Sequence, residues 1–441
     1  MKIKNIVLLI VIFFQLNLGS LFAEQVLTLK STLKKSLQDN HYLKSKKYEL
    51  VSKEKEMLIS KDALYPKIFL EEKVTNGNYN SYAVFTRLNQ ETLTMTNFFN
   101  PGTVTNFQTS INLEMPIYVR ELFVNKDIKK SFFLSSKSEF ENFKEEIAFQ
   151  TFKAYLSVLK AKANLDIVKK SLEEAKEVYR TAKLRVENGL SVTSDELRAY
   201  VHLKERESAL IKAENDLKIA KEMLALIISE DKEFDVEEES IKDDILPELN
   251  ISIKEALKDR KDLLSGKYSL EGLKNVVEIE KSKYYPKVFL GLSYFNDGRN
   301  FPMAGDGSGY TAGINLRWDI FDKTRTESKE KALADMYKLK EIVNQMEKEI
   351  VFKVKESYFR VEEARKRTEV SQEAVKEAEE TFRLIRLRYD NNLATIVELI
   401  DAENSLNIAR NSLIISKNDY YEAIGKSLFE AGLFTKSFIK E

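Results

Sequence analysis

The residues best placed to do chemistry lie in one short stretch near the end of the chain. Residues 387–402 read LRYDNNLATIVELIDA and combine Tyr389 with the carboxylates Glu398 and Asp401. Carboxylates can act as general acids or bases, or cap the free N–H groups at the start of a helix. No nucleophile or histidine accompanies these carboxylates in an apolar setting. The sequence therefore favours an electrostatic role over catalysis.

An earlier stretch repeats this arrangement. Residues 184–199 read LRVENGLSVTSDELRA, so both copies begin with Leu-Arg and carry a carboxylate seven residues after an Asn. Asp195 is thereby the counterpart of Glu398. The turn residues that correspond are Asn188, Gly189 and Leu190 in the first copy and Asn391, Asn392 and Leu393 in the second. Asn tolerates left-handed backbone next best to Gly, so both turns can form.

The composition narrows the chemistry further. The chain of 441 residues has no Cys and two His, His41 and His202, which excludes a thiol nucleophile and a disulfide framework. Each His is expected on a solvated helix face, and we expect no metal and no cofactor. The glycine run at 305–309 lacks the following helix of a phosphate-binding loop. Lys+Arg and Asp+Glu both total 70, which argues against a nucleic-acid partner. The sequence predicts that the protein is not an enzyme.

Long helical patterns lead into both stretches. Residues from about 122 to 187 contain neither Pro nor Gly, and apolar residues recur there at alternating spacings of three and four, as in a coiled coil. Such a helix would be roughly 100 Å long. A second rod is predicted from about 324 to 391, and a helix resumes after the first turn up to about 228.

Two β-prone segments precede the rods. The motif YPKIFL at 65–70 is answered by YPKVFL at 285–290, and FQTSINLEMPIY at 107–118 is answered by YTAGINLRWDIF at 310–321. Alternating apolar residues indicate strands, so β-hairpins are expected at about 66–118 and 286–321. The first inter-strand segment is the longer one, which an exposed loop tolerates. Helices are expected before each hairpin, at 26–64 and 251–283.

These elements divide the chain into two structural repeats. The first spans 24–245 and the second spans 246–441, and an acidic linker at 229–250 crosses the boundary between them. Residues 1–23 combine a basic start, an apolar run and a small residue at Ala23, which is the layout of a signal peptide. After Ala23 no stretch approaches the ~18 apolar residues of a transmembrane helix. Since single-chain outer-membrane barrels begin at about eight strands, four strands would have to be pooled among copies to close a barrel.

Together these features resemble the TolC-like outer-membrane efflux proteins, over residues 24–441. The resemblance implies a trimeric α+β membrane protein in which a β-barrel and a long α-helical coiled-coil barrel are built from duplicated helix–strand–strand–helix repeats. It implies a gated channel-tunnel in the outer membrane, with a large periplasmic extension, serving a tripartite efflux or type I secretion system. The implied partners are two further copies, a periplasmic adaptor, an inner-membrane pump or ABC exporter, and outer-membrane lipid.

The resemblance also assigns roles at the tips. Tyr389 falls on the family's gate tyrosine, whereas Glu398 and Asp401 fall on its acidic tip positions, with Asp195 as their partner in the first repeat. Ala394 stands where a well-known member has an arginine that closes the tip, so Arg388 is a candidate substitute.

Alternatives remain open at three levels. The carboxylates Asp195, Glu398 and Asp401 could form an acidic ring that faces the channel lumen, or could only cap helices. Tyr389 could be a gate residue, or could only pack. Apart from these alternatives, the resemblance implies that six turn residues contact the adaptor, namely those from Asn188 to Leu190 and from Asn391 to Leu393. The alternative function is a periplasmic coiled-coil structural or adaptor protein that forms no pore.

Overall fold

The computed structural model describes residues 25–238, 245–303, 305 and 307–439. The expected signal peptide and residues 239–244 of the acidic linker lie outside them. The chain forms two compact units, each of which takes segments from both repeats. One unit holds the described residues up to Lys47, Glu139–Leu263 and the residues from Gln345 onward; the other holds Tyr48–Ser138 and Leu264–Asn344. Among the described helices, none combines the length and the hydropathy of a membrane-spanning segment.

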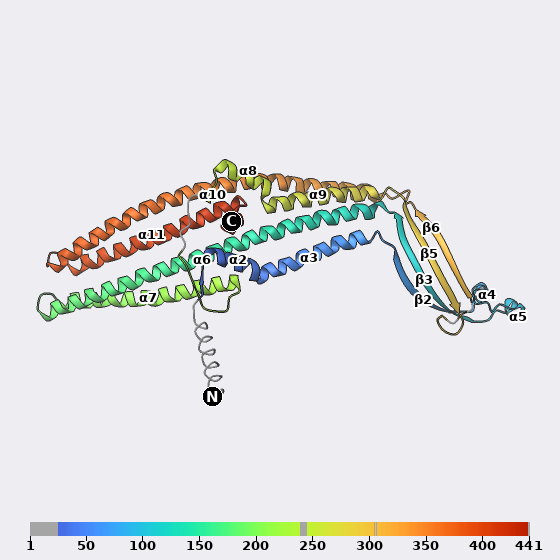
Figure 1. Ribbon diagram of the computed structural model, residues 1–441, viewed down its shortest axis with the longest axis horizontal. Helices are drawn as coiled ribbons and strands as arrows, with labels where there is room; N and C mark the ends of the chain where they lie inside the picture. Colours follow the sequence, from blue (N-terminus) through green and yellow to red (C-terminus); the bar gives the residue numbers. More distant parts are fainter. Residues whose placement is uncertain (1–24, 239–244, 304, 306, 440–441) are drawn as a thin grey trace, which may run out of the picture. The chain divides into compact units, whose positions relative to one another are not determined.

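The same order of elements occurs twice (Figure 1). The first series is α2 (Leu29–Asp39), α3 (His41–Asp62), β2 (Lys67–Gly77), β3 (Val104–Tyr118), α6 (Arg120–Glu187) and α7 (Thr193–Ile228). The second is α8 (Leu249–Asp259), α9 (Lys261–Ser282), β5 (Lys287–Gly298), β6 (Gly307–Arg317), α10 (Thr324–Asp390) and α11 (Ile396–Glu430). The helices α6 and α10 have 68 and 67 residues, so the two predicted rods are present.

The helices predicted at 26–64 and 251–283 are each interrupted, which corrects the prediction. Asn40 has an extended ψ of 123° and ends α2, and its side-chain oxygen accepts a hydrogen bond from the Leu43 N–H at the start of α3. Arg260 likewise has a ψ of 125° between α8 and α9. Both residues make long-range contacts, Asn40 to the carbonyl of Ile227 and Arg260 to Glu430, so tertiary interactions fix the breaks.

Further short elements lie where the sequence predicted turns or a linker. Helices α4 (Asn80–Asn89) and α5 (Met95–Phe99) occupy the long segment between β2 and β3. In the acidic linker, β4 (Phe234–Val236) pairs in parallel with β1 (Gln25–Leu27). The carboxylate of Asp235 lies 2.5 Å from the Lys162 ammonium, so part of this acidic segment is packed and neutralised.

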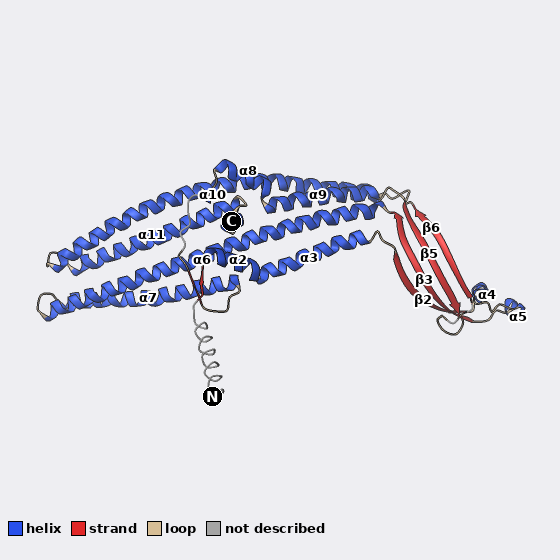
Figure 2. Ribbon diagram, viewed as in Figure 1, coloured by secondary structure: helices blue, strands red, loops and turns tan. Residues whose placement is uncertain are grey.

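The four longer strands form one antiparallel sheet in the order β2-β3-β5-β6 (Figure 2). Successive residues of a strand point to opposite faces, so the register assigns each side chain to a face. One face, called the apolar face here, carries Ile68, Leu70 and Val74 of β2, Phe107, Ile111, Leu113 and Met115 of β3, Val288, Leu290, Leu292 and Tyr294 of β5, and Tyr310, Ala312, Ile314 and Leu316 of β6. The opposite, polar face carries mainly charged, amide, hydroxyl and Gly residues.

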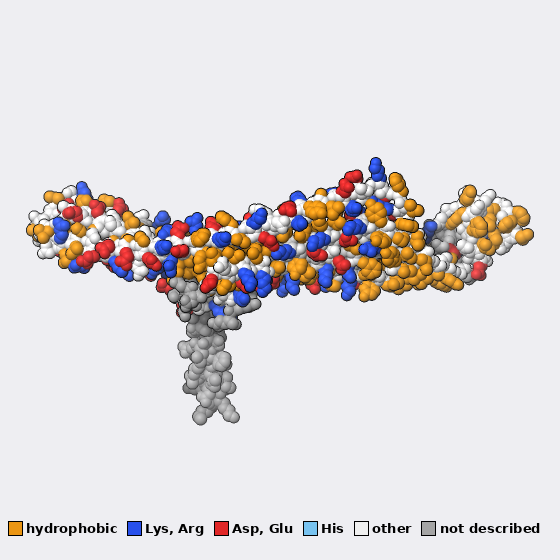
Figure 3. Space-filling model, turned by 90° about the horizontal axis from the view of Figure 1, so that it is seen from above, with side chains coloured by type: hydrophobic (Ala, Val, Ile, Leu, Met, Phe, Trp, Pro, Cys, Tyr) orange, Lys and Arg blue, Asp and Glu red, His pale blue; other side chains and the backbone are white. Residues whose placement is uncertain are grey.

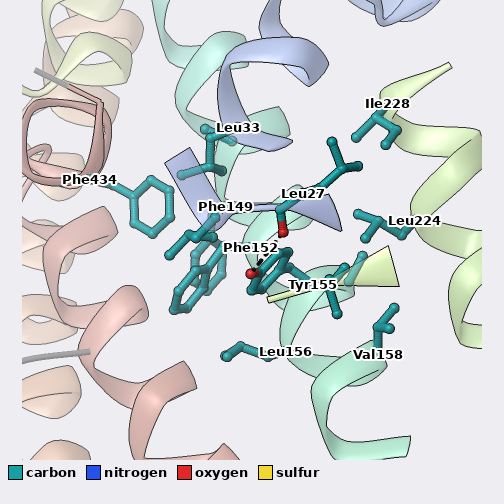
Figure 4. Close-up of a cluster of buried hydrophobic side chains, with 14 of the residues drawn as sticks. Leu27, Leu33, Phe149, Phe152, Tyr155, Leu156, Val158, Leu224, Ile228 and Phe434 are labelled. Atoms are coloured by element: carbon teal, nitrogen blue, oxygen red, sulfur yellow. Dashed lines mark hydrogen bonds between the residues drawn. The ribbon is translucent and has the colours of Figure 1, made fainter. Parts of the chain in front are cut away.

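The principal core of the first unit lies where α6 passes α2, α7, α11 and the C-terminal α12 (Phe434–Phe438). Aromatic side chains dominate it: Phe152 and Phe434 are fully buried, and their rings meet edge to face at 5.4 Å (Figure 4). The Tyr155 hydroxyl lies 2.6 Å from the Glu237 carbonyl and 3.3 Å from the Leu27 carbonyl, so it ties the small β1–β4 sheet to α6.

A Gly425→Ala variant is expected to lower the free energy of unfolding by about 1–3 kcal/mol, the usual cost of overpacking a core. A methyl group on Gly425 would lie 2.4 Å from the Phe152 ring, which is held by its aromatic neighbours. Denaturant titration in detergent measures the change. The double variant Gly425→Ala/Phe152→Leu should recover part of the loss, whereas equal instability of the single and double variants would contradict the packing argument.

Candidate functional site

The turn after α6 has a defined hydrogen-bonded geometry. Gly189 adopts a left-handed φ of +71°, and the Leu190 N–H donates to the Arg185 carbonyl at 2.7 Å. This is the six-to-one bond of a Schellman motif, which satisfies a carbonyl at the end of a helix. The Asn188 amide donates to the Leu184 carbonyl at 2.7 Å.

The turn after α10 has the same geometry, although Asn replaces Gly. Asn392 adopts a φ of +59°, and the Leu393 N–H donates to the Arg388 carbonyl at 2.7 Å. The Asn391 amide donates to the Leu387 carbonyl at 2.8 Å. The two turns predicted from the sequence therefore form, and each presents an exposed leucine at its apex, Leu190 and Leu393.

Glu398 caps the start of α11. Its carboxylate accepts a hydrogen bond from the Thr395 N–H at 2.6 Å, and the Thr395 hydroxyl in turn accepts from the Glu398 N–H at 3.2 Å. The hydrogen bonds that the N–H and the hydroxyl of Thr395 donate to the carboxylate lower the pKa of Glu398, and the nearby Arg388 charge lowers it further. Glu398 is thus an ionised, exposed capping residue, as one of the two alternatives predicted.

The other two carboxylates have different surroundings. Asp195 is half-buried in the first turn of α7 and accepts a hydrogen bond from the Ser191 hydroxyl at 2.5 Å. Asp401 is exposed on α11, where it lines a shallow groove between α7 and α11 together with Val201 and Ile400. Asp195 and Glu398 both lie at helix starts, whereas Asp401 lies beyond the first turn of α11.

Tyr389 is buried in a small core shared by the two helical hairpins, together with residues such as Ala182, Ala199 and Leu399. Only 5% of it is exposed. Burial raises the pKa of the Tyr389 hydroxyl; the Arg185 charge opposes this shift and the Asp195 charge adds to it. The hydroxyl is therefore neutral, and within one protomer Tyr389 is a packing residue.

Arg185 joins the two tips, and the sequence analysis did not single it out. Its guanidinium lies 4.2 Å from the centre of the Tyr389 ring. It also donates to the carbonyls of Tyr389 and Asp390, at 2.8 and 3.1 Å. Arg388, the proposed substitute for a closing arginine, donates instead to Leu393 in its own turn. The available signal was the Leu-Arg pair that begins both matching stretches.

A buried polar contact lies further along the same hairpins. His202 on α7 is 3% exposed, and its Nε2 lies 3.2 Å from the carboxylate of Glu403 on α11. Ser171 on α6 donates to the same carboxylate at 3.2 Å. The expectation of a solvated face is therefore wrong for His202, because α7 turns this residue toward α11, whereas His41 is exposed as expected.

Comparison with solved structures identifies the class of fold. A structure of CusC superposes with a TM-score of 0.78 at 14% identity, covering 94% of this chain and 92% of that one. The Campylobacter jejuni CmeC outer membrane channel superposes with a TM-score of 0.76 at 16% identity, covering 92% and 86%. The long helical hairpins with a small sheet are thus the fold of outer-membrane channel-tunnels.

Sequence comparison identifies the family. The outer membrane efflux protein family matches residues 32–230 and 252–424, and the chain belongs to this family. The outer membrane protein TolC of Vibrio cholerae serotype O1 is 22% identical over 325 residues, which are 70% of this chain and 73% of that protein. The resemblance inferred from the tip and strand motifs is confirmed.

Proposed function

We propose that this chain forms, as a homotrimer, the outer-membrane channel-tunnel of a tripartite efflux or type I secretion system. Three four-stranded sheets would close a twelve-stranded β-barrel in the cell outer membrane, and the long helices would form an α-helical barrel across the periplasm. The observation that supports this most is the sheet itself, which combines one apolar face with two edge strands, β2 and β6, paired on one side only among the described residues.

The dimensions and chemistry of the sheet suit a lipid environment. Its strands have 11 to 15 residues, compared with the roughly 9–11 needed to cross a bilayer as tilted β-strands. Its apolar face leaves large side chains in solvent, for example Tyr310 at 81% and Ile314 at 69% exposure, and hydrophobic side chains gather over the strands in Figure 3. A structural or adaptor protein without a pore has no evident use for such a face.

The edge strands require partners because unpaired backbone groups are costly in lipid. The internal repeat predicts how they pair. Within the chain, Ile111 of β3 pairs with Tyr294 of β5, and the repeat makes Ile314 the counterpart of Ile111 and Val74 the counterpart of Tyr294. Applied between copies, this register pairs β6 of one protomer with β2 of the next, so that Ile314 faces Val74 and Arg317 faces Glu71. The first of these pairs joins two apolar side chains on one face, and the second joins opposite charges on the other.

The paired turns suit the role of a closed entrance that contacts other proteins. Leu190 and Leu393 would present apolar apices to a periplasmic adaptor, which in turn would connect to an inner-membrane pump or ABC exporter. Arg185 would hold the tip closed by fixing one hairpin to the other through Tyr389. Threefold symmetry would place Glu398 and Asp401 three times each around the opening.

The proposal predicts where the protein resides and how many copies assemble. Membrane fractionation should recover the full-length protein with the outer membrane, and native mass spectrometry after mild detergent extraction should give a trimer. A soluble periplasmic monomer would contradict the proposal.

A channel with Glu398→Gln and Asp401→Asn is expected to lose part of its preference for cations, because rings of carboxylates favour cations in a narrow opening. Gln can still accept the capping hydrogen bond from Thr395, so the turn should be retained. Reversal potentials in a salt gradient across a planar bilayer measure the selectivity. An unchanged reversal potential would place both side chains outside the ion path.

A further inference from the structure

The segment at 78–103, called the insert here, connects β2 and β3 at the end of the sheet opposite to α3 and α6. It is folded by its own contacts. The Arg87 guanidinium donates to the carbonyls of Pro101 and Thr103 at 3.1 and 3.2 Å. At the end of α4, the Gln90 amide is 2% exposed and donates to the carbonyls of Thr105 and Gly298. These contacts hold the insert against the ends of β3 and β5.

The register shows which face of the sheet the insert covers. Gly77 and Gly307 belong to the polar-face series of β2 and β6. A Cβ built on Gly77 would lie 3.1 Å from the Tyr82 ring, and one built on Gly307 would lie 1.6 Å from the Asn89 carbonyl. The insert therefore occupies the space above the polar face at both edge strands.

A contact on the two central strands, at the same end of the sheet, agrees with this placement. The Gln90 amide donates to the Asn106 side chain at 2.9 Å, and Asn106 donates to Asp297 at 2.5 Å. Asn106 and Asp297 also belong to the polar-face series, on β3 and β5. Helix α4 thus crosses the end of the polar face from β2 to β6.

The side of the insert away from the sheet is apolar. Ala83 and Thr86 of α4 are buried, whereas Phe85 is 63% and Leu88 is 52% exposed on the opposite stripe. On α5, Phe99 is 78% exposed, and its ring packs edge to face against Phe98. Figure 3 shows hydrophobic side chains gathered on this part of the molecule. Exposed apolar surface rimmed by polar residues usually marks an interface.

We propose that the inserts of three copies meet over the outer mouth of the channel and constrict it, with the apolar side chains of α4 and α5 packed against those of the neighbouring copies. The inference rests on the proposed trimer, in which the polar face lines the pore. A second copy is favoured over lipid as the occupant because the insert meets the side-chain positions of Gly77, Asn106 and Gly307 on the polar face. An insert held on that side projects toward the axis of the ring and away from the membrane.

Cysteine cross-linking tests the contact, since the natural chain has no Cys. Phe85→Cys and Phe99→Cys variants, oxidised in outer-membrane vesicles, are expected to give disulfide-linked dimers, because a threefold axis lets two of three thiols pair. Tyr310→Cys on the apolar face is the control and should stay uncross-linked. Native mass spectrometry of each variant reports separately whether the trimer has formed.

Conductance tests the constriction. The variant Phe85→Ser/Phe98→Ser/Phe99→Ser keeps the Arg87 and Gln90 anchors, and we expect its open-channel conductance to exceed that of the wild type by at least about twofold, since a narrow hydrophobic passage limits ion flow. Intact trimers that neither cross-link at Phe85 and Phe99 nor change conductance would overturn the inference while leaving the proposed channel standing. A fluorophore attached to either cysteine that is quenched by lipid-borne spin labels would assign the insert to the membrane surface and also overturn the inference. A chain found only as a monomer would overturn both proposals.

Discussion

An Arg185→Ala channel is expected to show a mean conductance at least about tenfold above that of the wild type, because the contact that joins the two tips is lost. The Arg185 guanidinium lies over the buried ring of Tyr389 and donates to two main-chain carbonyls of α10. A partly desolvated cation–π contact contributes about 1–2 kcal/mol, and a hydrogen bond from a charged group about 1.5–3 kcal/mol. Since 1.4 kcal/mol is a factor of ten in an equilibrium, losing even part of this energy favours the open tip.

Single-channel recording in planar bilayers measures this effect. The matched control is Arg180→Ala on the same helix, because Arg180 is exposed and bonds only to Glu177 one turn away among the contacts described. Arg388→Ala is an informative second variant, since the Arg388 guanidinium donates to the Leu393 carbonyl within its own turn. If Arg388→Ala opened the channel and Arg185→Ala did not, the closing contact would lie between copies at Arg388, and the role assigned to Arg185 would be wrong.

Replacing Arg260 by Met is expected to destabilise the first unit by about 3 kcal/mol, the lower end of the cost of breaking a buried ion pair, because Lys426 still binds the Glu430 carboxylate at 2.7 Å. The Arg260 guanidinium binds the Glu430 carboxylate at 2.7 Å and the Glu430 carbonyl at 3.0 Å. The side chains of Arg260 and Glu430 are 10% and 5% exposed. This pair fixes the end of α11 to the break between α8 and α9, so its loss should lower the denaturant midpoint of the helical signal.

The variant Arg260→Met/Glu430→Leu should recover much of that stability, because an apolar pair can replace a buried ion pair at little cost. Burial acts to raise the pKa of Glu430, but Lys426 and Arg260 outweigh it, so the pKa lies below its ordinary value. The stabilisation is therefore present above the ordinary carboxylate pKa of about 4.3 and is lost as the pH falls through the lowered value. A single variant as stable as the wild type at neutral pH would contradict this account.

The sequence predicts the elements that depend on local patterns. The absence of Pro and Gly and the regular apolar seam place the long helices to within a few residues, and alternation places all four strands of the main sheet. The turns at Gly189 and Asn392 follow from their neighbours, because a Schellman motif needs one residue that tolerates a positive φ. Each of these features is determined by residues that lie close together in the sequence.

Features that depend on distant partners are the ones that sequence reasoning missed. The helix breaks at Asn40 and Arg260 are fixed by contacts to α7 and α11, which no local pattern reveals. Arg185 and Arg388 are equivalent in the sequence, yet only Arg185 reaches the other hairpin. His202 is buried because α7 packs on α11 there and brings it to Glu403, a contact that the sequence around His202 does not reveal.

The central claim is that neighbouring copies join β6 to β2 in the register of the internal repeat, and one cross-linking measurement tests it. That register places Asn315 of one copy opposite Lys73 of the next, both on the polar face. The variant Lys73→Cys/Asn315→Cys, treated in outer-membrane vesicles with a short thiol-specific cross-linker, should give covalent trimers on a denaturing gel. Each single-cysteine variant should remain monomeric on that gel. A double variant that also runs as a monomer, while native mass spectrometry finds it trimeric, would contradict the predicted register; a chain that is not trimeric at all would contradict the channel.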